Sequence, residues 1–514
     1  MTDKPQDTAP EAIEQKPGFA GFARAFLPLW PFVLGLTFGR SGIIIASFGS
    51  YTQTDDGIYT DGSMLITVAL FGLAVLFMFA TKARLSKQQA KWALLTGVAF
   101  EALALVGLAF LEITGSNDTG IRFALCTCAT LFGSVALSYW LRRARGTTTA
   151  IAAAFTFSAL FLSEIIIYAC ALIPPSAGFL LGLFFVLLQY PCLRAARSRS
   201  KLFLASSTMN AQDYFGFAKS MLSSRNFLVA TACGVAVMSI AIGMLRGYPT
   251  GDPITFTNVT RIAYMVITMS IAATIVILVA KGRRQIMTVG IWLIMQTLAC
   301  FALLCYTAFP GSLDIGAVFT TTLNAMMTAF SWYLVIAFMS YGWRDPFFYA
   351  FSGWIVWLGA RAIARIAIIE AYPLAANDMF MTVAIAVMLI LSTQVVFVQF
   401  IYIAKSERDQ EKTKTSKRQS TIERLMGLDA SGGLSGMRQA TMRHNAEEMG
   451  KQFLLSDREV EVLSLYALGF TQKRVADELY ISQGTAHAHI KRIYAKTGLH
   501  SRQEIIDYMQ QYTT

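Results

Sequence analysis

The chain has 514 residues, of which 55% are hydrophobic and only 14% are charged. A soluble protein of this length would need more charge on its surface, so the composition excludes an ordinary soluble chain and indicates an integral membrane protein. The net charge of +12 does not separate nucleic-acid binding from membrane insertion, because membrane proteins also carry surplus Lys and Arg in their cytoplasmic loops.

Apolar stretches of membrane-spanning length follow a polar N-terminal tail at 1–25. A bilayer core takes about 20 apolar residues per helix, and this length predicts about twelve spans within 26–404. The sequence therefore predicts an all-α fold, in which a polytopic bundle of twelve membrane helices precedes a C-terminal four-helix domain. The expected spans are 26–50, 63–81, 92–113, 121–141, 147–171, 176–193, 226–246, 259–280, 286–307, 315–340, 347–371 and 379–404.

The loops between these spans alternate in charge. Basic residues gather after the second, fourth, sixth and eighth spans, whereas the loops between them carry Asp and little Lys or Arg. The positive-inside rule makes the basic loops cytoplasmic. We therefore expect a multi-pass protein of the inner (cytoplasmic) membrane with both termini in the cytoplasm.

The longest internal loop, 194–225, divides six spans from six. This arrangement resembles the major facilitator superfamily of transporters, in which two six-helix halves are related by a pseudo-twofold axis. The Gly, Asp and Arg loop motif of that family is absent from the basic loops after the second and eighth spans. The resemblance implies one alternative function, a secondary transporter with a regulatory tail.

Five charged residues fall inside the predicted spans: Arg40, Glu101, Glu164, Arg361 and Arg365. Isolated charges at that depth cost several kcal/mol unless they are paired or hydrated. Two interpretations stay open, a ligand pocket or ion pairs that fix helix packing. Because arginine suits carboxylate and phosphate groups, the first interpretation predicts a small anionic ligand held in the outer half of the bundle.

The sequence offers no catalytic or metal-binding constellation. All seven cysteines fall inside apolar runs without a CxxC pair, and all four histidines follow residue 440. This spacing suits no zinc site and leaves the spans without a His base. We therefore expect no metal, no cofactor and no enzymatic activity.

Polar residues of mixed charge, Ser and Thr fill 405–450, together with a glycine-rich piece at 431–436. Such composition predicts a flexible cytoplasmic linker. A coil of about 45 residues would span roughly 35 to 40 Å root-mean-square, which would let the C-terminal domain reach DNA near the membrane.

The segment 451–514 carries the start and stop signals of four short helices. Capping boxes and N-cap residues open helices, and glycine just beyond a helix ends it. The signals are the boxes Ser456–Glu459 and Ser501–Glu504, the caps Thr471 and Ser482, and the glycines Gly469 and Gly498.

Apolar spacing orients the third of these helices. Ala486, Ile490 and Ile493 recur at the 3.6-residue period, so they are expected to face the other helices. The other faces then present His487, Ala488, Lys491, Arg492 and Ala495 outward or toward the flanks of the helix, and these are the groove-facing candidates.

The C-terminal segment resembles the LuxR-type regulators over about 60 residues. The matching positions are Leu455 to Leu463, Gly469, Val475, Ala476, Leu479, Ile481, Ser482, Thr485, His489, Ile493, Tyr494, Lys496, Gly498, Ser501 and Arg502. In that family the third helix enters the major groove of double-stranded DNA and the fourth commonly mediates dimer contacts. The resemblance implies DNA contacts from Thr471, Lys473, Arg474, Ser482, Gln483, Thr485, His487, Ala488, Lys491 and Arg492, and it implies a homodimer.

Two residues depart from the family pattern, which usually has Val at the position of Ala486 and Lys or Arg at that of His487. His487 replaces a permanent charge with a group that is mostly neutral at pH 7, so base preference is expected to differ. The sequence as a whole predicts a membrane-bound one-component transcription regulator that senses a signal through its membrane domain. A protein-docking module remains the alternative for the tail.

Reporter fusions test the predicted topology. A reporter after Thr514 or within 194–225 should be cytoplasmic, and one in the loop from Asp55 to Asp61 should be external, because the basic loops stay inside. An external C-terminus would exclude DNA binding by the intact protein.

Overall fold

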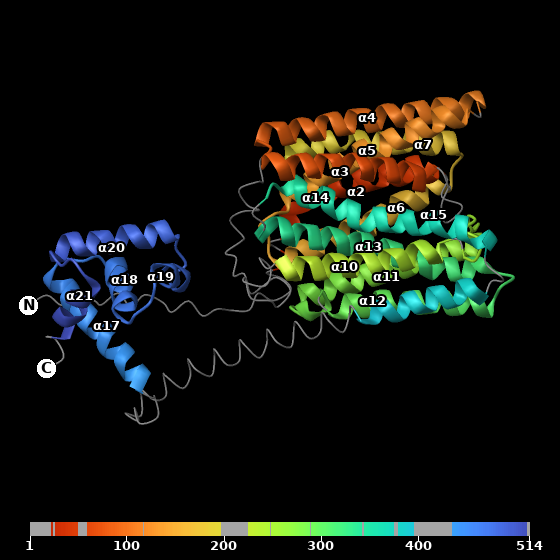
Figure 1. The fold of residues 1–514 in the computed structure, drawn as a ribbon. Helices are drawn as coiled ribbons and strands as arrows, with labels where there is room; N and C mark the ends of the chain where they lie inside the picture. Colours follow the sequence, from red (N-terminus) through yellow and green to blue (C-terminus); the bar gives the residue numbers. More distant parts are fainter. Residues whose placement is uncertain are drawn as a thin grey trace, which may run out of the picture. The chain divides into compact units, whose positions relative to one another are not determined.

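The computed structural model describes residues 22–23, 26–49, 59–116, 118–196, 225–246, 248–287, 289–341, 344–374, 379–394 and 434–510. The chain divides into two compact units, Met1–Asp409 and Gln410–Thr514, called here the membrane unit and the tail unit. Both are helical, and these described ranges contain no β-strand, which confirms the all-α prediction (Figure 1). Each unit is considered by itself.

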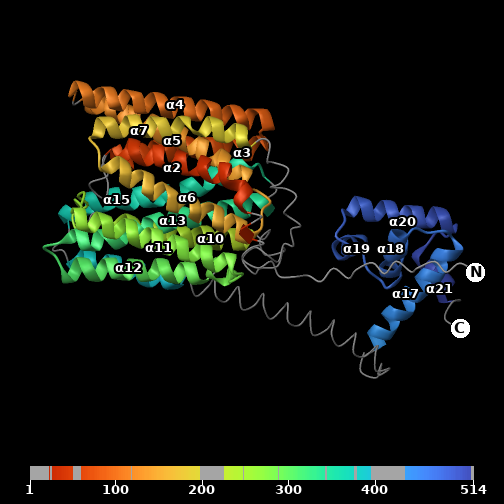
Figure 2. The same ribbon diagram turned by 180° about the vertical axis from the view of Figure 1, so that it is seen from behind.

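Long helices lying side by side build the membrane unit, as both views show (Figures 1 and 2). The first six are followed by a second series that begins with α10. Their bounds are α2 (Trp30–Phe48), α3 (Asp61–Thr81), α4 (Lys87–Thr114), α5 (Thr119–Arg143), α6 (Thr149–Ala171), α7 (Pro175–Leu187), α10 (Arg225–Leu245), α11 (Asn258–Ala280), α12 (Val289–Ala308), α13 (Leu313–Tyr341), α14 (Pro346–Trp354) and α15 (Ala360–Ala371).

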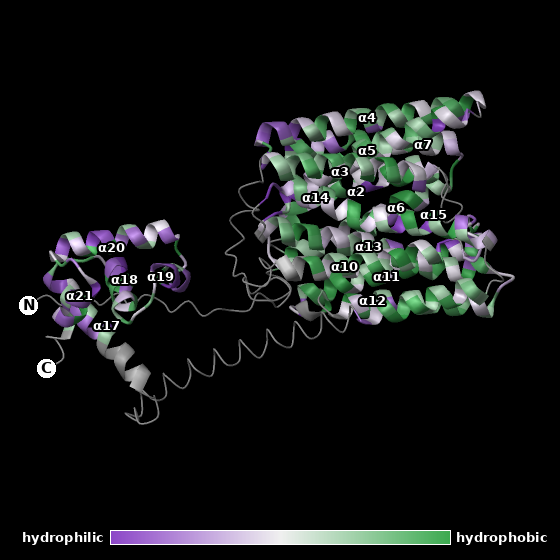
Figure 3. Cartoon of the chain, in the orientation of Figure 1, coloured by the Kyte–Doolittle hydropathy of each residue, from purple (hydrophilic) through white to green (hydrophobic). Residues whose placement is uncertain are grey.

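Ten of the described helices are long and apolar enough to cross a membrane. Two further apolar helices, Thr231–Leu245 and Met379–Gln394, are shorter within the described residues. Hydrophobic residues cover most of these helices, whereas the tail unit is largely polar (Figure 3). The chain is therefore a multi-pass membrane protein, and the number twelve stays a prediction. The N-terminal tail up to Gly21, most of the loop 194–225 and the loop residues Asp55 and Asp56 lie outside the described residues.

Small residues let the membrane helices approach closely, as expected where packing replaces the hydrophobic effect. A Cβ added at Gly97 of α4 would lie 2.8 Å from the carbonyl oxygen of Phe132 in α5. A Cβ at Gly243 of α10 would lie 2.4 Å from the carbonyl oxygen of Arg361 in α15. Gly243 therefore fixes the depth and rotation of the segment that carries Arg361.

The two series of helices meet along several contacts. α6 packs against α11 and α13, while α3 packs against α14, α15 and the π-helix η5 (Ile355–Gly359) that joins them. Residues from both series thus face one another in the middle of the unit.

The described part of the tail unit, 434–510, contains five helices, one more than the sequence predicts. They are α17 (Leu434–Gln452), α18 (Asp457–Ala467), α19 (Gln472–Glu478), α20 (Gln483–Thr497) and α21 (Arg502–Gln510). Their shared core includes Met449, Val462, Leu463, Ile490 and Ile505. The tail unit has its own core and is expected to fold independently.

The prediction of a coil up to Gly450 is wrong for its last part, because 434–450 lies in α17. Met442, Ala446 and Met449 of this helix are buried in the core, and the Asn445 side-chain amide donates to the carbonyl oxygen of Met509 at 2.9 Å. α17 thus belongs to the domain, and the remaining linker residues, 405–433, lie outside the described residues.

Replacing Met449 tests whether α17 is part of the domain. In the fragment 434–514, Met449→Ala should lower the free energy of unfolding by about 2 to 5 kcal/mol, because it removes a fully buried side chain and leaves a cavity. Urea denaturation measures the change. Arg443→Ala on the same helix, with its side chain 73% exposed, is the control and should stay within about 0.5 kcal/mol of the parent. Equal stability of the two variants would contradict the packing of α17.

Candidate nucleic-acid interface

The predicted capping signals form the hydrogen bonds that they require. Ser456 Oγ accepts from the backbone N–H of Glu459 at 3.3 Å, and Glu459 Oε2 accepts from the backbone N–H of Ser456 at 2.9 Å. Thr471 Oγ1 accepts from the backbone N–H of Arg474 at 3.3 Å. These caps satisfy backbone donors that a helix start leaves open and fix where α18 and α19 begin.

A tight turn leads from α19 into α20. Tyr480 adopts a left-handed backbone with φ of 56°, and Ser482 caps α20 by accepting from the backbone N–H of Thr485 at 3.0 Å. The Tyr480 side chain is 95% exposed. Tyr480 lies two residues before the N-cap of α20. The sequence did not identify it as a candidate surface residue, because a turn residue has no periodic pattern.

One face of α20 is buried and the other is open, as the spacing predicts. Ala486, Ile490 and Ile493 lie in the core. Nearly all ten predicted DNA-contact residues lie on the surface. Thr471, Lys473, Arg474, Ser482, Gln483, Thr485, His487, Lys491 and Arg492 are exposed, and Ala488 is half-buried.

Two of the exposed residues are held by neighbours from α19 and its approach. His487 Nδ1 lies 3.3 Å from Gln472 Oε1, which links the first turns of α20 and α19. The Arg474 guanidinium lies over the Phe470 ring, 4.4 Å from its centroid. Lys473 of α19 and Lys491 of α20 are also exposed.

An ion pair between a buried carboxylate and a partly exposed lysine holds α20 against the start of α18. Lys496 Nζ lies 2.7 Å from Glu459 Oε2, and the Glu459 side chain is 4% exposed. Burial alone would raise the pKa of the Glu459 carboxyl, but hydrogen bonds from Lys496 and from the Ser456 backbone outweigh it and lower the pKa below its ordinary value. The charged carboxylate therefore stabilises the helix arrangement.

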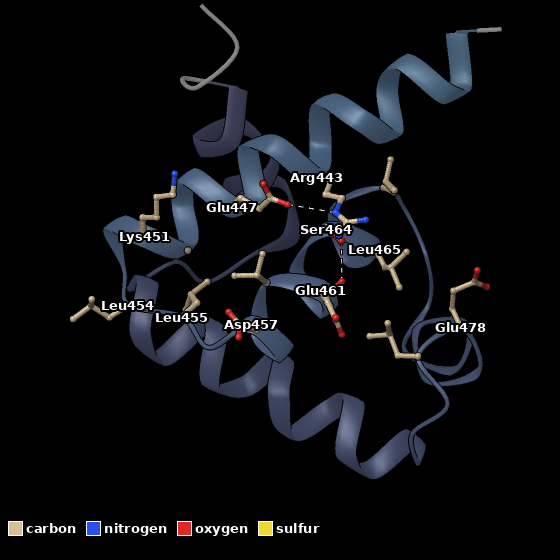
Figure 4. Close-up of a pocket in the computed structure, with 14 residues that line it drawn as sticks. Arg443, Glu447, Lys451, Leu454, Leu455, Asp457, Glu461, Ser464, Leu465 and Glu478 are labelled. Carbon is tan, nitrogen blue, oxygen red and sulfur yellow. Dashed lines mark hydrogen bonds and ion pairs between the residues drawn. The ribbon is translucent and has the colours of Figure 1, made fainter. Parts of the chain in front are cut away.

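The tail unit also has an open groove of about 730 Å³ between α17 and α18 (Figure 4). Arg443, Glu447 and Lys451 border it on α17, and Asp457 and Glu461 border it on α18. α20 contributes no residue to its lining, and none of the ten predicted DNA-contact residues is part of it. The groove is thus separate from the predicted DNA-binding face.

The tail unit has the parts of a helix-turn-helix domain. These are the three helices α18, α19 and α20, the tight turn before the exposed helix α20, and the fourth helix α21, which shares their core. Residues 454–509 match the family model GerE, described as "Bacterial regulatory proteins, luxR family". The tail unit therefore carries a LuxR-type DNA-binding domain of the kind found in transcription regulators, which confirms the resemblance seen in the sequence.

Curated relatives match a stretch of similar length. The "Fimbriae Z protein" of Escherichia coli (strain K12) is 46% identical over 59 residues, which are 12% of this chain and 28% of that protein. The "Oxygen regulatory protein NreC" of Staphylococcus aureus (strain JH9) is 42% identical over 55 residues, 11% of this chain and 25% of that protein. The chain thus spans about a quarter of the length of the relatives that it matches.

A solved structure aligns with a much larger part of the chain at low identity. It is the "Crystal structure of a bacterial homologue of iron transporter ferroportin in outward-facing state", with a TM-score of 0.44 and 12% identity. The alignment covers 75% of this chain and 100% of that one. At this TM-score the similarity does not define the fold of the membrane unit.

Two of the five charges in the membrane unit form an ion pair. Arg40 Nη2 of α2 lies 2.6 Å from Glu164 Oε1 of α6, and both side chains are buried. Arg40 also donates to Ser163 Oγ at 2.5 Å, and the Tyr264 hydroxyl of α11 donates to Glu164 Oε2 at 2.6 Å. The pair lies within the first series of helices, and the hydrogen bond from Tyr264 connects it to the second.

The other three charged residues have different surroundings. Arg361 Nη1 donates to Asn324 Oδ1 of α13 at 2.9 Å, and Arg365 donates to the backbone carbonyl oxygens of Arg246 and Gly251. The Glu101 side chain is fully buried where α4 meets α2 and α5, with Oε1 beside Gly42 and Gly133. Arg40 and Arg361 line one cavity, and Arg365 and Glu101 do not contribute to its lining.

The pH dependence of tail-unit stability tests the Glu459–Lys496 ion pair. The pKa of Glu459 is lower in the folded state than its ordinary value of about 4.3. Its contribution is therefore present above about pH 4.3 and is lost as the pH falls through the folded pKa.

In the fragment 434–514, Glu459→Gln should lower the free energy of unfolding at pH 7 and should lose less stability than the parent between pH 7 and pH 3, measured by urea denaturation. Glu447→Gln, an exposed carboxylate on α17, is the matched control and should follow the parent. An unchanged acid sensitivity in Glu459→Gln would show that the pair does not stabilise the fold.

Proposed function

We propose that this protein is a membrane-tethered transcription regulator that binds promoter DNA through its tail unit. One observation carries the proposal: a LuxR-type domain and ten membrane-capable helices occur in the same chain. The membrane unit lies in the inner membrane with both termini in the cytoplasm, in agreement with the basic loops. The tail unit then meets the chromosome directly.

The exposed face of α20 enters the major groove of double-stranded DNA in this proposal. Gln483, Thr485, His487, Ala488 and Lys491 lie at the start and middle of that helix, where side chains reach bases or nearby phosphates. Thr471, Lys473, Arg474, Ser482 and Arg492 contact the phosphate backbone and fix the register. α21 supplies the dimer contact, as the family resemblance implies.

The membrane unit acts as the sensor in the proposal, and its ligand is a small molecule. The supporting observation is that buried charges from both series of helices meet in the middle of the unit, at Arg40, Glu164 and Arg361. A ligand that binds one arrangement of the helices more tightly than another shifts their balance. The alternative, a secondary transporter with a regulatory tail, would show gradient-driven substrate accumulation in vesicles that contain the protein.

Two lysine variants test the DNA-binding face. Lys491→Ala and Lys473→Ala in the fragment 434–514 should weaken binding to target promoter DNA, and each should reduce the salt slope of the binding constant by up to about one unit if it removes one phosphate contact. If Lys491 reads a base instead, its loss should cost about 1 to 3 kcal/mol and relax the preference at one position. Binding measured by fluorescence anisotropy at several salt concentrations separates the two outcomes.

Lys451→Ala is the matched control, because Lys451 is an equally exposed lysine on α17, paired with Glu448 at 2.7 Å. Its affinity and salt slope should equal those of the parent. If all three variants bind alike, α20 is not the helix in the groove.

A further inference from the structure

A small cavity lies where the two series of membrane helices face each other. Its volume is about 50 Å³, and it is lined from α2, α3 and α5 on one side and from α11, α13, α14, η5 and α15 on the other. Arg40 and Arg361 contribute to it from opposite series. Occupancy of such a cavity would depend on how the two series are arranged.

Three buried polar groups in the lining have no hydrogen-bond partner among the described residues. They are the indole N–H groups of Trp332 and Trp357 and the hydroxyl of Thr321. Their residues are only 3 to 4% exposed. An indole nitrogen can only donate a hydrogen bond, and a donor buried without an acceptor is unfavourable. Acceptor atoms of an occupant of the cavity would satisfy the N–H groups of the two tryptophans.

The charged residues of the lining are positive, which matches the partial positive charge on the hydrogen atoms of these donors. Of the sixteen described residues that line the cavity, two are arginines and none is acidic. Glu164, which is not part of the lining, pairs with Arg40 at 2.6 Å. Arg361 donates to the neutral Asn324 and lies over the Trp357 ring, 5.8 Å from its centroid. The lining thus favours a negatively charged occupant.

The volume limits the size of that occupant. A buried water needs about 10 to 15 Å³ measured in this way, so 50 Å³ holds only a few heavy atoms. A planar oxyanion, such as a small carboxylate, bicarbonate or nitrate, combines this size with several acceptor oxygens.

We propose that this cavity is the signal site and that its ligand is a small planar oxyanion, held by the indole N–H groups of Trp332 and Trp357, the Thr321 hydroxyl and the Arg361 guanidinium. The signalling role rests on the function proposed above, whereas anion binding by itself does not. Trp357 lies in the π-helix η5, a distortion that is frequent at functional sites. Binding would bias the arrangement of the two helix series because both contribute to the lining.

Anion-dependent thermal stability of the full-length protein in lipid nanodiscs tests the proposal. Formate, acetate, bicarbonate and nitrate are compared at equal ionic strength with chloride, and acetate is also compared with acetamide, which has the same shape without the charge. At least one oxyanion should raise the unfolding midpoint in a saturable manner, because it binds the folded state, and acetamide and chloride should not. The pattern among the four identifies the source of the oxyanion.

Conservative variants then locate the site. Trp332→Phe and Trp357→Phe each remove one N–H and keep a ring, and each should weaken the apparent Kd roughly tenfold; Arg361→Gln should abolish the response. Trp92→Phe is the matched control, because Trp92 lies on α4 with 58% of its surface exposed, and it should respond as the parent does. The comparison of acetate with acetamide in the parent remains decisive if a variant does not fold.

Two results would overturn the proposal. One is that no oxyanion raises the midpoint more than chloride or acetamide, and the other is that both Phe variants bind as tightly as Trp92→Phe. DNA binding by the fragment 434–514 is measured separately, so a failure there would reject the regulator and leave anion binding standing. A failure of anion binding with intact DNA binding would reject only this site.

Discussion

Hydrocarbon surroundings cannot solvate polar groups, so each one buried in the membrane unit needs a partner inside the protein. This constraint explains most of the polar contacts between its helices. Arg40 meets Glu164 and Ser163, and Arg365 reaches backbone carbonyls near the end of α10. The same constraint makes the indoles of Trp332 and Trp357 informative, because both residues line a cavity and their N–H groups have no hydrogen-bond partner among the described residues.

The tail unit follows a different rule, since water surrounds it and local hydrogen bonds set its helix ends. Caps at Ser456, Thr471 and Ser482 place the helix starts, and the Glu459–Lys496 pair then holds α20 at a fixed angle to α18. The predicted DNA-contact residues therefore lie on a domain with its own core. In the proposed function, regulation acts on where the domain is presented or on its pairing, and not on whether it folds.

The sequence predicts those parts of the structure that depend on local interactions. The tail caps and the apolar face of α20 are of this kind, and all were predicted at the residues where they occur. α17 was missed although its buried Met442, Ala446 and Met449 recur at the same spacing as Ala486, Ile490 and Ile493, because the polar composition of 405–450 and its glycine-rich piece favoured a linker. In the membrane unit the sequence identifies the charged residues but not their partners, since Arg365, for example, donates to a backbone carbonyl oxygen. The tryptophans that line the cavity could not be predicted either, because they resemble any aromatic residue in a span.

The extension of the tail unit back to Leu434 sets a limit on where the proposed regulator can work. The sequence predicts that the last span ends at 404, which leaves the 29 residues 405–433 before α17, and a chain of that length spans at most about 95 to 105 Å when fully extended. In the proposed function, a promoter is accessible only when its stretch of chromosome comes within about this distance of the bilayer. Gene position and nucleoid organisation would thereby become inputs to the response, alongside any dissolved signal.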